Sequence, residues 1–99
     1  MPYPPHVSDA APDLAHRRQR ARFRAWHRGT READYMFGGY FDRYVADGDE
    51  PTLAWFEALL QEEDVDVMAW ALGTAPLPDR FAGDLGKQLC TVDYVDIPR

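Results

Sequence analysis

Residues 25–44 read AWHRGTREADYMFGGYFDRY and contain the signals that end one helix and begin another. Gly29 predicts the end of the first helix, because glycine enters the left-handed backbone conformation without steric cost. Thr30 predicts the cap of the next helix, since its hydroxyl can accept a hydrogen bond from a free backbone N–H. Four aromatic side chains then recur at the i, i+3, i+4 and i+7 spacing of one helix face: Phe37, Tyr40, Phe41 and Tyr44. The stretch therefore predicts two helices joined by a tight turn.

The rest of the chain repeats this helical pattern. The first helix is expected from about Leu14 to Trp26, with Phe23 and Trp26 facing the core. After the aromatic stripe, Pro51 suits the start of a helix that ends near Leu60. A short helix follows, with Asp64 as its N-cap and Gly73 as its stop. A last helix is expected to carry Phe81, Leu85 and Leu89.

These elements predict an all-α fold, a small single-domain bundle of about five short helices. We expect a flexible N-terminal tail over residues 1–12, a helical domain over 13–92 and a C-terminal tail over 93–99. Three further aromatic side chains are predicted to belong to the core with Phe81: Trp55, Phe56 and Trp70. Trp26 and Tyr35 fit either the core or the rim of an interface.

Composition narrows the class of protein. A chain of 99 residues with 45% apolar and 28% charged residues suits one globular domain. Its single cysteine, Cys90, excludes an internal disulfide, fits a reducing compartment and is expected to be small, buried and inert. No apolar run approaches the ~20 residues that span a membrane, so we expect no membrane insertion. The N-terminus lacks the order of a secretory signal, and a bacterial cytoplasm is the expected location.

Charge is distributed unevenly along the chain. Seven arginines lie between Arg17 and Arg31, whereas fifteen acids and four basic residues follow from Glu32 onward. Along the first helix and the residues just after it, four arginines have the spacing of one helix side: Arg17, Arg20, Arg24 and Arg28. Such asymmetry favours a partner surface, although two solvated helix faces would give the same pattern.

The chain shows no self-contained catalytic, metal or cofactor site. Its histidines and Cys90 lack the spacing of zinc ligands, no glycine-rich phosphate loop is present, and the only serine, Ser8, lies in the expected tail. Glu32 and Asp34 are two residues apart on a helix, so they point to nearly opposite sides and cannot work as an acid–base pair. We therefore expect no enzyme.

Two classes of binding protein would explain the arginines. A nucleic-acid-binding helical module would use the stripe on phosphates, although the acidic remainder would repel nucleic acid and no recognition helix follows the turn. An antitoxin-like regulatory protein would need only the charge asymmetry. Locally, Arg28 and Glu32 could also do no more than fasten the helix junction.

Residues 28–32, RGTRE, match the RGxxE motif of the succinate dehydrogenase assembly factor family, whose members are flavinylation factors. Asp34 occupies the acidic position two residues after the glutamate. Residues 59–70, LLQEEDVDVMAW, resemble the second signature of that family. Together the resemblance covers residues 14 to 92, and it departs at Val65, where proline is common, and at Gly39, where a larger residue is common.

The resemblance implies a helical assembly factor that is not an enzyme. Such a factor binds the flavoprotein subunit of succinate dehydrogenase, or of the similar fumarate reductase, and promotes covalent attachment of FAD to a histidine of that subunit. The FAD is attached to the partner, so this chain is expected to hold no cofactor, and we expect a monomer that binds no nucleic acid. The implied protein-binding residues surround the turn: His27, Arg28, Gly29, Arg31, Glu32 and Asp34.

Overall fold

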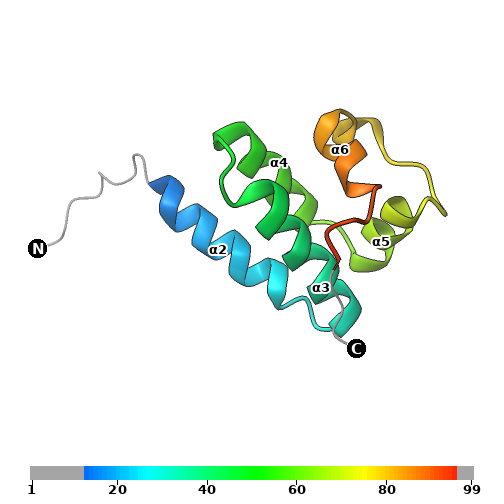
Figure 1. Cartoon of the computed structure of the whole chain (residues 1–99), viewed down its shortest axis with the longest axis horizontal. Helices are drawn as coiled ribbons and strands as arrows, with labels where there is room; N and C mark the ends of the chain where they lie inside the picture. Colours follow the sequence, from blue (N-terminus) through cyan, green and yellow to red (C-terminus); the bar gives the residue numbers. More distant parts are fainter. Residues whose placement is uncertain (1–12, 96–99) are drawn as a thin grey trace, which may run out of the picture.

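The computed structural model describes residues 13–95, which contain helices, turns and loops and no strand (Figure 1). Its α-helices are α2 (Leu14–Trp26), α3 (Arg31–Tyr40), α4 (Glu50–Leu60), α5 (Asp64–Leu72) and α6 (Asp84–Leu89). A π-helical turn over Phe41–Val45 continues α3, and a 3-10 turn over Asp79–Phe81 precedes α6. The expected all-α bundle of five short helices is confirmed. The expected tail over residues 1–12 lies outside the described part of the chain.

Most helix ends follow local sequence signals. Gly29 has a φ of 118° after the end of α2, and the Thr30 hydroxyl accepts a hydrogen bond from the Ala33 N–H at 3.2 Å. Gly73 ends α5 in the left-handed conformation. The expected N-cap at Asp64 is wrong by one residue, because Glu63 holds that position and Asp64 is the first residue of α5.

The helices α2 and α3 run side by side in opposite directions, and α4 packs against α2 (Figure 1). Close packing of α2 on α3 depends on Gly38, since a methyl group there would overlap the indole ring of Trp26. The core is aromatic at its centre, where the Tyr40 and Phe56 rings stack with centroids 5.9 Å apart. The expected core residues Phe56, Trp70 and Phe81 are buried.

The C-terminal segment also belongs to the packed body. Tyr94 is 5% exposed and its ring meets Tyr40 edge to face at 5.2 Å. The Tyr40 hydroxyl donates to the Leu85 carbonyl at 2.8 Å, and the Tyr94 hydroxyl donates to the Leu89 carbonyl at 2.5 Å. These two tyrosines fasten α6 to the core, so residues 93–95, expected as part of a tail, contribute a core side chain.

Phe23 is exposed, against the expectation that it faces the core. Its side chain is 63% exposed, and α2 buries Ala21 and Ala25 instead. The reason is helical geometry: two small residues at i and i+4 let α2 approach its neighbours closely, and Phe23 lies about 200° around the helix from either alanine. Trp26, expected on the same side, is half-buried.

Three other expectations near the C-terminal half need correction. Phe81 lies in the 3-10 turn rather than in the last helix, although its ring is buried. Trp55 is only half-buried. Cys90 is exposed rather than buried, because it follows the last turn of α6.

Candidate functional site

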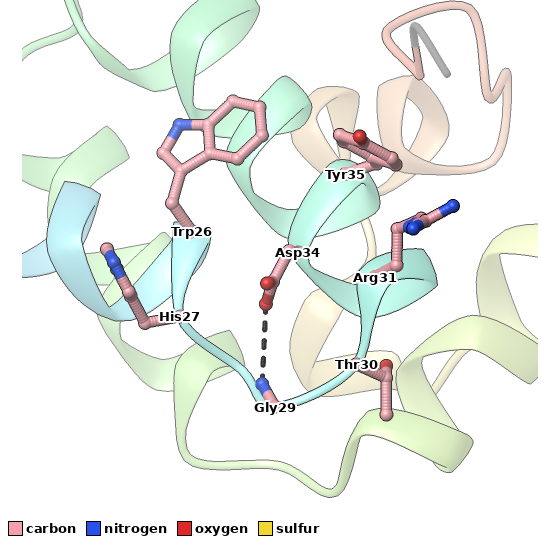
Figure 2. A pocket seen from close by; sticks show the side chains of 7 residues that line it. All are labelled: Trp26, His27, Gly29, Thr30, Arg31, Asp34 and Tyr35. Carbon is pink, nitrogen blue, oxygen red and sulfur yellow. Dashed lines mark hydrogen bonds between the residues drawn. The ribbon is translucent and has the colours of Figure 1, made fainter. Parts of the chain in front are cut away.

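The turn between α2 and α3 is closed by an acid from α3. The Asp34 Oδ1 atom accepts hydrogen bonds from the backbone N–H of Arg28 at 2.5 Å and of Gly29 at 3.3 Å, and the second is drawn in Figure 2. These amides follow α2 and would otherwise need water as a partner. Asp34 therefore stabilises the backbone conformation of the turn.

Arg28 extends from the same turn toward the junction of α4 and α5, and its side chain is only 11% exposed. Its guanidinium binds the Asp64 Oδ1 atom at 2.7 and 2.8 Å. It also donates to the carbonyls of Leu60 at 3.0 Å and Glu62 at 3.2 Å, and it lies 4.2 Å from the ring centroid of Phe37. A cation at the negative end of α4 is favourable, so Arg28 joins the turn to α4 and α5.

Other arginines of the expected stripe also face α4. Arg17 binds Glu50 at 2.9 Å and Glu57 at 2.7 Å, and the hydrogen bonds that it donates, first to Glu57 and then to Glu50, raise its pKa above the usual range. Arg24 donates to the Leu60 carbonyl at 3.4 Å. Three of the four stripe arginines thus bind groups within this chain, which weakens the case for a nucleic-acid-binding surface.

The remaining residues of the expected site face outward. Gly29, Arg31 and Glu32 are exposed, as is His27, whose Nδ1 lies 2.7 Å from the Phe23 carbonyl oxygen. At Gly29, a Cβ atom would meet no other atom within 4 Å. The expected set therefore divides into two structural residues, Arg28 and Asp34, and four outward residues.

An open hollow of about 510 Å³ lies beside the turn. Figure 2 shows Trp26 and His27 on the α2 side and Arg31 and Tyr35 on the α3 side, with Gly29 below. Trp26 and Tyr35 are half-buried and line the hollow, where their rings meet edge to face at 6.3 Å. The sequence pattern did not show which side chains of α2 are buried and which are exposed.

Residues 13–95 hold no group of three or more histidine, cysteine or acidic side chains placed to bind a metal ion. Within the same residues, every helix is too short or too polar to cross a membrane. The hollow instead combines a cation, an acid and aromatic edges with an open backbone turn. Such a surface suits contact with another macromolecule.

Comparison with known proteins gives a consistent result. The sequence profile of a family described as "Flavinator of succinate dehydrogenase" matches residues 19–93. The chain is 37% identical over 80 residues to the FAD assembly factor SdhE of Acetobacter pasteurianus, covering 81% of this chain and 73% of that protein. It is 35% identical over 80 residues to the mitochondrial succinate dehydrogenase assembly factor 2 of Saccharomyces cerevisiae, covering 77% of this chain and 49% of the relative.

The corresponding protein of Drosophila virilis is 30% identical over 91 residues, which cover 90% of this chain and 58% of the relative. The chain thus spans about half of the length of the mitochondrial relatives and more of the bacterial one. All three relatives are named as assembly factors rather than enzymes.

Proposed function

Because the chain belongs to the family of flavinators of succinate dehydrogenase, we propose that it binds the flavoprotein subunit of that enzyme, or of fumarate reductase, and promotes covalent attachment of FAD to a histidine there. The observation that carries the proposal is the bare turn at Gly29. Its φ of 118° and the open space at its missing Cβ let another backbone approach closely. Arg31 and Glu32 lie exposed beside it and can form charge-assisted hydrogen bonds with a partner.

The proposal assigns this chain a positioning role. The flavoprotein supplies the histidine and receives the FAD, and this chain holds the subunit so that the two reacting groups meet. Correct positioning alone can lower a barrier by several kcal/mol, at most about 7–11 kcal/mol. Arg28 and Asp34 act indirectly by fixing the turn, whereas His27, Gly29, Arg31 and Glu32 form the contact. We also propose that this protein acts as a monomer in a bacterial cytoplasm.

The test follows covalent flavin on the flavoprotein subunit by in-gel fluorescence after mixing apo-subunit, FAD and this protein. Wild type should accelerate labelling, and Glu32→Ala should reduce the acceleration about tenfold or more, because a hydrogen bond to a charged group contributes about 1.5–3 kcal/mol. The matched control is Asp66→Ala, which removes an exposed acid from the first turn of α5.

Asp66→Ala should behave as wild type. No acceleration by wild type would overturn the proposed function, and equal losses in both variants would overturn the site. Circular dichroism of each variant checks that the helices are retained.

A further inference from the structure

Phe23 is the one aromatic side chain more than half exposed in the described part of the chain. Its ring stacks on the ring of His27, with centroids 4.0 Å apart and an interplanar angle of 17°. The His27 Nδ1 atom is also held near the Phe23 carbonyl oxygen at 2.7 Å. An exposed apolar ring that is already fixed in place loses little conformational freedom on binding, which is the property of an interface anchor.

Hollows lie on both sides of this ring. One, of about 340 Å³, is lined by Gln19, Arg22, Trp26 and His27 with Phe23. The other, of about 330 Å³, is lined by His16, Gln19 and Arg20 with Phe23. Trp26 and His27 also line the hollow at the turn, so the surface along α2 is continuous with the proposed site.

The charge of this surface is positive in a chain that carries a net charge of −6. Arg20 and Arg22 flank Phe23, and Arg31 lies beyond the turn. Arg22 shares only a long, exposed ion pair with Asp42, at 3.4 Å with side chains 64% and 44% exposed. Exposed pairs of this kind contribute little to stability. Positive charge around an exposed ring therefore fits a partner surface that carries carboxylates around an apolar recess.

We infer that the outward face of α2, formed by Gln19, Arg20, Arg22, Phe23 and His27, is a second part of the docking surface for the flavoprotein subunit. The ring of Phe23 enters an apolar recess of that subunit, and Arg20 and Arg22 face acidic side chains at its rim. This inference rests on the proposed function. It separates two tasks: the turn at Gly29 acts on flavin attachment, and the α2 face supplies affinity.

The test is a binding titration of apo-flavoprotein subunit with wild type, Phe23→Ala and Leu72→Ala. Leu72 is a matched control, because it is an apolar side chain 59% exposed on α5. Phe23→Ala should weaken binding about tenfold or more, as loss of an interface anchor does, and Leu72→Ala should leave binding unchanged. Circular dichroism should show both variants folded.

A second titration tests the role of charge. It compares Arg20→Glu with Lys87→Glu, which makes the same change of charge at an exposed position on α6. Arg20→Glu should weaken binding and reduce its dependence on salt, whereas Lys87→Glu should do neither. If wild type binds and Phe23→Ala or Arg20→Glu binds no more weakly than its control, the inference is overturned and the proposed function stands. If wild type does not bind the subunit, both are overturned.

Discussion

Replacing Arg28 by alanine should destabilise the fold more than any change at an exposed arginine of α2. The substitution removes the ion pair with Asp64, two hydrogen bonds to the carbonyls of Leu60 and Glu62, and the contact with the Phe37 ring. Hydrogen bonds to charged groups contribute about 1.5–3 kcal/mol each, before rehydration of the groups left behind. Asp64 is already 29% exposed beside Arg28 and gains further water when the arginine is removed, so we expect a net loss of about 2–4 kcal/mol.

A loss of that size is a large fraction of the ~5–15 kcal/mol that stabilises a typical domain. It corresponds to a decrease in Tm of at least about 8 °C for a chain of this length. The assay is urea unfolding followed by circular dichroism, with Arg20→Ala on the preceding helix α2 as the control. Surface changes of that kind usually stay within about 0.5 kcal/mol. An unfolding free energy for Arg28→Ala within 0.5 kcal/mol of the control would refute the structural role of Arg28.

Two further predictions concern the core. Gly38→Ala should lower the unfolding free energy by about 1–3 kcal/mol, because the new methyl group would overlap the indole of Trp26; an unchanged urea midpoint would contradict this. Burial raises the pKa of Tyr40 and of Tyr94 above the usual value of a tyrosine side chain. The folded state thus favours the neutral phenols. Their contribution to the free energy of unfolding is complete below about pH 10 and is lost as pH rises above it. Urea titrations from pH 8 to 11 should show a smaller alkaline loss for a Tyr40→Phe, Tyr94→Phe double variant; equal losses would argue against this cause.

Helix positions could be predicted from sequence because their signals are local. Thr30 and Gly73 act through a residue three positions away or through their own backbone, and both act as expected. Gly29 has the expected positive φ, but it shapes the turn two residues after His27, the C-cap of α2. Phe23 shows the limit of the same reasoning. A phenylalanine side chain is usually buried, but the face that a helix buries depends on the helices packed against it. In α2 the buried face is the one with two alanines, which let the neighbouring helices approach more closely than Phe23 would.

The position of the turn could be predicted from the sequence, but the roles of the residues around it could not. The RGTRE motif places the turn, yet nothing in the motif shows that Arg28 extends to Asp64, 36 residues away. Asp64 was expected as a helix cap, and it instead supplies the carboxylate for that arginine. Long-range pairs of this kind depend on how the helices pack, which local spacing does not determine.

The turn at Gly29 and the adjacent face of α2 form the proposed contact with the flavoprotein subunit. Amide hydrogen exchange of this protein, alone and bound to the apo-subunit, tests it most directly. We expect slower exchange in residues 19–35, above all at the exposed turn, with little change in α5 and α6. Protection confined to α5 and α6, with the turn exchanging as freely as in the unbound protein, would contradict it.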